Sequence, residues 1–287
     1  MTGALIKSIM VPVRGDGMGA NVLAHAAVVA KKFASRVQVV HCHPRADDLM
    51  PFGVVIPAAM RQQIEKAAQA NVDVTAKQLS SEFKDIAAKL DLKEQNPGQD
   101  DASAVFVEYE GKQIDAVKHF GRLADLICIP QPEPERNLGA NTLKTALFSS
   151  GRAVMMCPNG GSVPQDFCER VTFAWNGSLE ASRAAALAMP LIETAQSVTI
   201  LTSGESEHSA SAEEFQVYLE TRGVSSTVRR FAGHGVVGGQ LLEETEAVGA
   251  GLLIMGAYHQ SFERETVLGG NSQTVVSQSK KPVVLVH

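Results

Sequence analysis

The strongest constraint on this chain is that its sequence contains the same succession of motifs twice, in the same order. A repeated sequence unit usually folds as a repeated structural unit. The chain is therefore predicted to contain two copies of one fold. Four pairs of segments correspond between the copies: 11–15 with 173–177, 126–129 with 252–255, 138–142 with 268–272, and 153–157 with 283–287.

A short stretch of turn-forming residues separates the two copies. Residues 158–164 read PNGGSVP, which supplies little apolar surface to bury, as expected of a linker. We therefore predict a first domain at residues 1–158 and a second at 168–287. The length of 287 residues agrees with this division, because domains average roughly 150 residues.

Each copy alternates short β-branched runs with stretches of helical periodicity. Such alternation is typical of a parallel sheet with helices on both faces. The predicted fold class is α/β, with two repeated, open, parallel five-stranded sheets and flanking helices. Strands are predicted at 8–13, 36–42, 103–109, 125–129 and 153–157 in the first copy, and at 171–175, 197–202, 227–231, 252–255 and 283–286 in the second. Helices of the second copy are predicted near 179–189, 210–222, 237–249 and 271–279.

The first copy contains an insertion between its opening strand and its fourth strand. The opening segments of the copies are offset by 162 residues and the fourth strands by 126, so the first copy holds 36 additional residues. Residues 57–90 absorb them and show helical apolar spacing after Pro57, which suits a first helical turn. This insertion is predicted to cover the sheet, with a partner-binding surface as the alternative.

Composition excludes several classes of partner. Lys and Arg number 26 against 31 Asp and Glu, which gives a formal charge of −5 and a pI of about 5.9. No overall field attracts nucleic acid. No apolar run approaches the ~18 residues that span a membrane, and residues 1–13 are a poor signal peptide. We therefore predict a cytoplasmic protein that binds neither membrane nor nucleic acid.

The cysteines and one histidine pair give little support for metal chemistry. Four cysteines are scattered without a C-x-x-C pair, and we interpret them as inert thiols, mostly buried. In the strand at 36–42 the sequence HCH places His41 and His43 on one face and Cys42 on the other, so at most two ligands converge. No metal site is predicted.

The loop after the fourth strand of the second copy is the best candidate for ligand binding. In an open parallel sheet the ligand crevice lies at the carboxyl ends of the strands, where the strand order reverses. Residues 256–272 begin with a glycine, contain two more near their end, and lead into a predicted helix. Glycines let backbone approach a ligand, and a helix N-terminus offers free N–H groups to an anion. We therefore predict an anion-binding cradle here.

The same residues carry a family resemblance. The whole chain resembles a tandem universal stress protein, because MGAY at 255–258, RE at 264–265 and VLGG at 267–270 are similar to the signature loop of that family's two-domain bacterial branch. The resemblance implies an adenine-nucleotide alpha-hydrolase-like fold and a regulatory, non-catalytic role in stress response. It also implies an internal pseudo-dimer in which the final strands, at 154–156 and 283–286, pair antiparallel and cover each other's edges.

The signature is only partly retained. In nucleotide-binding members of the family the loop reads G-x-x-G-x9-G-[S/T], and an acidic residue after the first strand contacts the ribose. Gly256 and Gly269 match two glycines, whereas His259 replaces the middle one and Gly270 replaces the Ser/Thr. Asn176 occupies the acidic position and can bond a hydroxyl without charge assistance. Two interpretations stay open: the second copy binds nucleotide, or the loop is kept as architecture.

The resemblance implies ATP or AMP as the ligand, in the second copy only, with Mg²⁺ accompanying ATP. The first copy has lost more of the motif: its fourth strand runs into PQPEPE at 130–135, and Arg14 stands at the acidic position. Prolines lack N–H donors and glutamates repel phosphate, so this pocket is predicted to hold no nucleotide. The binding residues implied for the second copy are Ala174, Asn176, Ser203, Met255, Gly256, His259, Gly269, Gly270, Asn271 and Ser272.

A second glycine pattern, GHGVVG at 233–238, matches the dinucleotide fingerprint G-x-G-x-x-G. It follows the third strand of its copy rather than the first, and the next strand ends without an acidic residue to hold a ribose. We interpret it as a turn that leads into a helix. The sequence contains no nucleophile elbow, Walker lysine or recognisable carboxylate pair, so no catalytic residue is predicted.

Two other functions stay open. The first is a weak ATP hydrolase or phosphotransferase, which needs a metal ligand and a positioned water or acceptor that the sequence does not reveal. The second is an interaction scaffold that works without nucleotide and uses residues 57–90 as its docking face. Partner proteins and association between chains are not encoded in any recognisable motif.

Overall fold

The computed structural model describes residues 5–13, 18–43, 57, 60, 77–94, 101–204, 209–233, 236–257 and 270–287. The strands in this part of the chain form one ten-stranded sheet, in the order β3-β2-β1-β4-β5-β10-β9-β6-β7-β8. The first half contributes β1 Ser8–Val13, β2 Arg36–His43, β3 Ser103–Glu110, β4 Leu126–Pro130 and β5 Ala153–Cys157. The second half contributes β6 Arg170–Ala174, β7 Ser197–Thr202, β8 Ser226–Arg230, β9 Leu252–Gly256 and β10 Val283–Val286.

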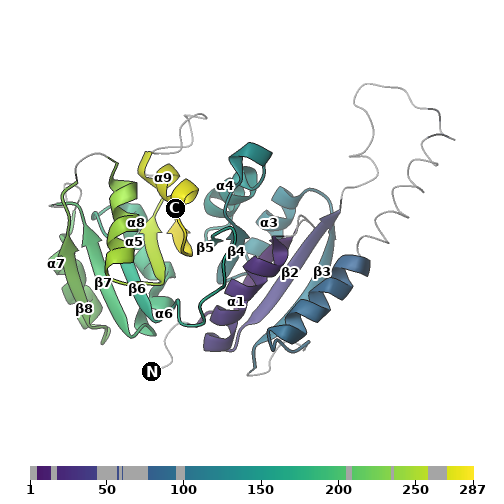
Figure 1. Cartoon of the computed structure of the whole chain (residues 1–287), viewed down its shortest axis with the longest axis horizontal. Helices are drawn as coiled ribbons and strands as arrows, with labels where there is room; N and C mark the ends of the chain where they lie inside the picture. The colour runs from purple at the N-terminus through teal and green to yellow at the C-terminus, as the bar shows by residue number, and fades with distance from the viewer. Residues whose placement is uncertain are drawn as a thin grey trace.

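Helices cover both faces of the sheet (Figure 1). One apolar core includes buried side chains of α1, α5, α6 and α7, and the opposite core includes those of α3, α4 and α9. Alternate strand residues face opposite cores, as the pleat requires. The helices are α1 Gly19–Phe33, α3 Gln113–Gly121, α4 Ala140–Ser149, α5 Leu179–Leu187, α6 Met189–Glu193, α7 Ala212–Glu220, α8 Val237–Ala247 and α9 Gly270–Gln278, with a short 3₁₀ turn, η2, at Pro134–Arg136.

The two halves of the sheet meet at β5 and β10. The strand pairs described within each half are parallel, whereas β5 and β10 are antiparallel, with Val284 opposite Met155. Figure 1 shows these strands between the two halves. The residues of β10 are at most 1% exposed. Complete burial of a Val or Leu side chain contributes about 1.5–3 kcal/mol, so the four side chains of β10 contribute several kcal/mol to stability.

A polar contact also joins the halves on the face covered by α1. Lys32 Nζ, near the end of α1, donates to the Thr194 carbonyl oxygen at 2.8 Å, directly after α6. Within the first half, Asn21 Nδ2 of α1 donates to the Pro158 carbonyl oxygen at 2.7 Å, where the linker begins. A lysine at the last carbonyls of a helix satisfies acceptors that have no partner within that helix. The first half therefore caps a helix of the second.

The described part of the insertion packs on the sheet. Residues 77–89 are helical, with Phe83 and Ala87 buried. The Phe83 ring lies 5.6 Å from the ring of Phe106 on β3, centroid to centroid. The rest of the predicted segment 57–90, apart from Pro57 and Met60, lies outside the described residues. The described portion covers one face of the first half, and its role as a partner surface stays a prediction.

The predicted fold class is confirmed: the protein is α/β, with mostly parallel strands and helices on both faces. The strands lie within one residue of the predicted ranges. The helix predicted at 179–189 is divided at Ala188, where Pro190 follows in the first turn of α6. Proline is tolerated in a first helical turn but not in a helix interior, which explains the break.

Candidate functional site

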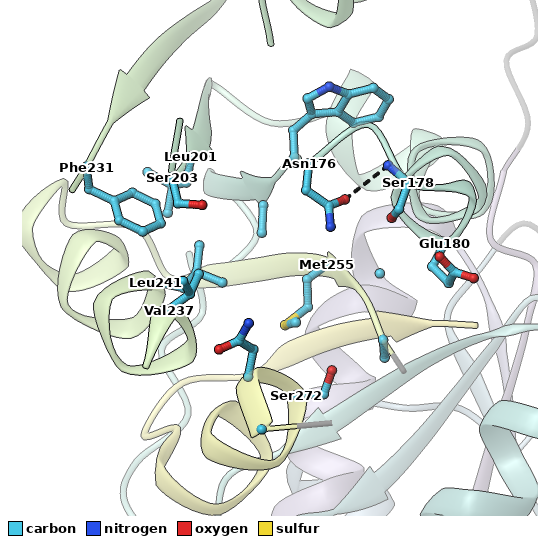
Figure 2. A pocket seen from close by; sticks show the side chains of 16 residues that line it. Asn176, Ser178, Glu180, Leu201, Ser203, Phe231, Val237, Leu241, Met255 and Ser272 are labelled. Carbon is cyan, nitrogen blue, oxygen red and sulfur yellow. Dashed lines mark hydrogen bonds between the residues drawn. The ribbon is translucent and has the colours of Figure 1, made fainter. Parts of the chain in front are cut away.

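A cleft of about 270 Å³ lies in the second half at the carboxyl ends of β6 and β9 (Figure 2). The chain leaves β6 toward β7 on one side and returns as β9 on the other, so the strand order reverses between β6 and β9. This is the position at which open α/β sheets bind ligands. The sheet topology alone therefore places a candidate site here.

The predicted binding residues that line the cleft come from four separate segments of the chain. Eight of the ten predicted binding residues line it: Ala174, Asn176, Ser203, Met255, Gly256, Gly270, Asn271 and Ser272. The other two, His259 and Gly269, lie outside the described residues. Eight further residues line the cleft without having been predicted: Trp175, Ser178, Glu180, Leu201, Phe231, Val237, Leu241 and Ala257.

Asn176 organises the turn between β6 and α5. Its Oδ1 accepts a hydrogen bond from the Ser178 N–H at 3.1 Å, and Ser178 Oγ accepts one from the Ala181 N–H at 3.2 Å. Ser178 is therefore the N-cap of α5. Figure 2 shows the amide nitrogen of Asn176 directed toward the cleft. The side chain thus uses its acceptor for the turn and presents its donor to the site.

Gly256 ends β9 where the strand passes α5. A Cβ added to Gly256 would lie 2.6 Å from the Ala181 nitrogen and 2.6 Å from the Glu180 carbonyl carbon. Both are backbone atoms, so a side chain would force the strand and the helix apart. The sequence indicated that Gly256 lets a ligand approach the backbone. The structure shows that the missing side chain lets α5 pack closely against β9.

The N-terminus of α9 forms one wall of the cleft. Gly270 begins the helix and is exposed, and a Cβ added to it would meet no described atom within 4 Å. Asn271 Oδ1 accepts a hydrogen bond from the Gly238 N–H at 3.3 Å. The first N–H groups of a helix have no partner within it and carry partial positive charge. This wall can therefore accept an anion.

The glycine pattern at 233–238 serves helix packing. A Cβ added to Gly238 would lie 2.3 Å from the Asn271 carbonyl oxygen, so only glycine lets α8 approach α9 this closely. Residues 234–235 lie outside the described residues. Close contact between α8 and α9 therefore explains the last glycine of the pattern, Gly238, without a dinucleotide.

The opposite wall is apolar and aromatic. The Trp175 indole is 8% exposed and stacks on Phe215 with ring centroids 4.0 Å apart and planes 3° apart. Its Nε1 donates to the Ala210 carbonyl oxygen at 2.9 Å. Leu201, Phe231 and Leu241 extend this wall. A cleft with one apolar wall and one wall of hydrogen-bond donors suits a ligand with a flat apolar part and a polar or anionic part.

Glu180 is the one charged side chain among the described residues that line the cleft. It lies in the first turn of α5 and is 9% exposed. Glu180 was not among the predicted binding residues, although an acidic residue two positions after a serine N-cap is typical of a helix start. The described lining contains no lysine or arginine.

The described residues almost fill the equivalent position in the first half. Between the carboxyl ends of β1 and β4 the described residues leave a cavity of about 10 Å³, which is roughly the space of one water molecule. Pro12 and Pro130 line it, and Thr142 Oγ1 donates to Gln113 Oε1 at 3.2 Å across its edge. Arg14 lies outside the described residues.

The cysteines and histidines occupy the environments that their sequence context indicates. Cys128, Cys157 and Cys168 are buried, and burial raises the pKa of the Cys168 thiol to about 12. His41 stacks on Phe106 in one core, whereas Cys42 packs against the other.

Among the described residues, no three His, Cys, Asp or Glu side chains form a metal-binding group. No helix in the described ranges has the length and apolarity needed to cross a bilayer.

An open α/β sheet with a cleft at its switch point defines an α/β protein with a candidate ligand site in its second half. Residues 170–287 match the model of the universal stress protein family. The match confirms, for these residues, the resemblance noted in the signature loop of the second half. A search of curated proteins finds no significant match.

Solved structures extend the likeness to both halves. A universal stress protein from Archaeoglobus fulgidus is 16% identical and superposes with a TM-score of 0.70, covering 97% of this chain and 95% of its own. A putative universal stress protein from Pseudomonas aeruginosa is 12% identical with a TM-score of 0.56, covering 98% and 93%. A universal stress protein solved in complex with cAMP is 13% identical over 55% of this chain and all of its own, with a TM-score of 0.34. The first two likenesses show that the whole chain shares the fold of these proteins.

Proposed function

We propose that the second half of this protein binds an adenine nucleotide in the cleft between β6, β9 and α9, and that the protein acts in stress response as a regulatory, non-catalytic module. One observation carries the proposal. Eight residues predicted from the sequence to bind nucleotide, contributed by four separate segments, line a single cleft at the switch point of the sheet. Its two walls differ in polarity, as a nucleotide requires.

The size and polarity of the cleft favour a mononucleotide. Its volume of about 270 Å³ is near the lower end of the roughly 300–1,000 Å³ typical of ligand sites. A base would pack against the wall that contains Leu201 and Phe231, and phosphates would face the N–H groups that begin α9. Mg²⁺ is usually held by one or two carboxylates together with substrate phosphates. Glu180 is the described carboxylate that would supply such a ligand.

We also propose that the two halves form an internal pseudo-dimer, with domains near residues 1–158 and 168–287. The antiparallel pairing of β5 with β10, and the parallel strands within each half, support this arrangement. In this arrangement the first half, with its nearly filled cavity, acts as the structural partner of the half that binds ligand.

Substitution at Gly270 tests the proposal. The chain has one tryptophan, Trp175, and it lines the cleft, so its fluorescence should report binding directly. We expect Mg-ATP to change this fluorescence saturably in the wild type. Gly270→Glu should weaken binding about tenfold or more, because it places a like charge near the phosphates without meeting any described atom. Titration of Trp175 fluorescence at constant ionic strength measures the effect.

Gly270→Ala is the matched control, since it adds a side chain without charge. It should bind Mg-ATP as the wild type does. Wild-type protein that shows no fluorescence change and no thermal shift at millimolar Mg-ATP would overturn the proposed function. Equal affinity in the Glu and Ala variants would show that the N-terminus of α9 does not contact the phosphates.

A further inference from the structure

A side chain of the first half caps a helix that lines the cleft of the second. Gln131 directly follows β4, and its Nε2 donates to the Val276 carbonyl oxygen at 2.8 Å and to the Ser279 carbonyl oxygen at 3.2 Å. Val276 lies in the last turn of α9, and Ser279 follows the helix. Carbonyl groups at a helix C-terminus have no partner within the helix, so Gln131 satisfies acceptors that α9 cannot satisfy itself.

Gln131 is itself held in place from several sides. Its backbone N–H donates to the Cys157 carbonyl oxygen at 2.8 Å, at the end of β5. Its Oε1 accepts from the Asn159 N–H at 3.3 Å, and its carbonyl oxygen accepts from Asn159 Nδ2 at 3.1 Å. The amide group therefore reaches α9 in a fixed orientation, which lowers the entropy lost in making the cap.

The opposite end of α9 forms the polar wall of the cleft. The helix has nine residues, which corresponds to a rod about 13 Å long at 1.5 Å per residue. A shift or tilt at Val276 is thus transmitted to Gly270 and Ser272, which line the cleft. At this end Asn271 is held by Gly238 of α8, so each end of the helix has its own anchor.

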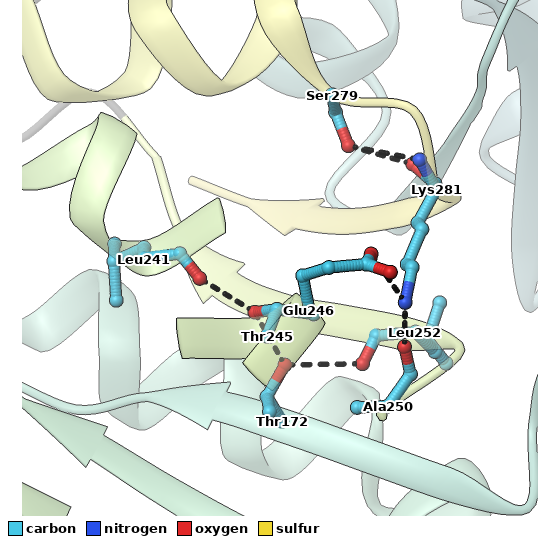
Figure 3. Close-up of polar contacts among 8 residues, drawn as sticks. All are labelled: Thr172, Leu241, Thr245, Glu246, Ala250, Leu252, Ser279 and Lys281. Atoms are coloured by element: carbon cyan, nitrogen blue, oxygen red, sulfur yellow. Dashed lines mark hydrogen bonds and ion pairs between the residues drawn. The ribbon is translucent and has the colours of Figure 1, made fainter. Parts of the chain in front are cut away.

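The turn that follows α9 is fixed independently within the second half (Figure 3). Lys281 Nζ donates to the Ala250 carbonyl oxygen at 2.6 Å and pairs with Glu246 at 2.8 Å. Ser279 Oγ donates to the Lys281 carbonyl oxygen at 2.7 Å. Loss of the Gln131 contact would therefore release the last turn of α9 without detaching the chain that enters β10.

We propose that Gln131 is a positioning residue for the cleft. Through Gln131, the start of the loop after β4 holds α9 in the orientation that presents its N-terminus to the ligand. Binding in the second half is thereby coupled to the structure of the first half at the end of β5. The expected effect on ligand affinity rests on the proposed function, whereas the hydrogen bonds between Gln131 and the end of α9 are independent of it.

Gln131→Glu removes the donor while keeping the shape of the side chain and its acceptor for Asn159. We expect Mg-ATP affinity, measured by Trp175 fluorescence, to fall about fivefold, as for the net loss of one hydrogen bond. Amide hydrogen exchange should become faster at both ends of α9, in residues 270–278. Gln131→Lys restores a donor to the helix C-terminus and should recover most of the affinity. Gln165→Ala is the control, since its side chain is exposed and, within the described ranges, bonds the nearby Val163 carbonyl oxygen at 3.3 Å.

The outcomes separate this inference from the proposed function. Weaker binding in Gln131→Glu, with recovery in Gln131→Lys and none of the effect in Gln165→Ala, supports the inference. Faster exchange confined to the last turn of α9, with wild-type affinity, overturns it. If the wild type binds no Mg-ATP, the proposed function fails and exchange alone decides: faster exchange at residues 270–274 in Gln131→Glu supports positioning through α9, and unchanged exchange there refutes it.

Discussion

Val284→Asp should leave little folded protein. Val284 is 0% exposed and lies opposite Met155 where β10 pairs with β5. The substitution removes a fully buried apolar side chain and places a carboxylate without a partner in the seam, so we expect a loss of about 4 kcal/mol or more. Whole domains are stable by only about 5–15 kcal/mol. Urea unfolding followed by Trp175 fluorescence and far-UV circular dichroism measures the effect.

Val236→Asp makes the same exchange at an exposed position and should have the opposite sign. Val236 is 56% exposed and is the N-cap of α8, with extended backbone and no side-chain cap. An aspartate there can accept hydrogen bonds from the first N–H groups of the helix and should stabilise the protein by about 1 kcal/mol.

A Val284→Asp variant as stable as the wild type would contradict the view that the β5–β10 seam holds the two halves together.

The fold was accessible from the sequence because its pattern is repeated and unambiguous. β10, for example, is a short apolar run bounded by a proline, and its counterpart β5 has the same character. Parallel strands buried on both faces must be apolar at every position, which makes them easy to recognise. The division of the helix at Ala188 was missed, because the apolar spacing continues through Pro190 and only the position of that proline in a first turn marks the break.

The candidate site was accessible only where a motif marked it. Asn176, Gly256 and Gly270 stand at motif positions and were found to line the cleft. Leu201 and Phe231 were not predicted, because an apolar residue at the end of a strand has the same pattern whether it faces a core or a ligand. Only the tertiary structure shows whether such a residue faces the core or the cleft. The contact of Gln131 with α9 could not be predicted either, since it joins residues 145 positions apart in different halves.

Gly238→Ala should destabilise the protein by about 2–3 kcal/mol, the upper part of the roughly 1–3 kcal/mol expected when a methyl group is forced into a well-packed contact. The added Cβ would lie 2.3 Å from the Asn271 carbonyl oxygen and 3.1 Å from its Cα. These are backbone atoms of the first turn of α9, so α8 and α9 must separate to make room. Since that turn lines the cleft, Mg-ATP binding should weaken as well. Thermal unfolding and Trp175 titration test both effects.

Gly239→Ala is the control, one residue further along the same helix. Its Cβ would meet no described atom within 4 Å, and alanine favours a helix over glycine by roughly 0.5–1 kcal/mol. This variant should therefore be at least as stable as the wild type and should bind ligand normally. If the two alanine variants had equal stability, close contact between α8 and α9 could not be the reason for the glycine at 238. The glycine pattern at 233–238 would then need another explanation, such as a bound ligand. A lower stability of Gly238→Ala than of Gly239→Ala would instead show that Gly238 is needed for the packing that orients the N-terminus of α9.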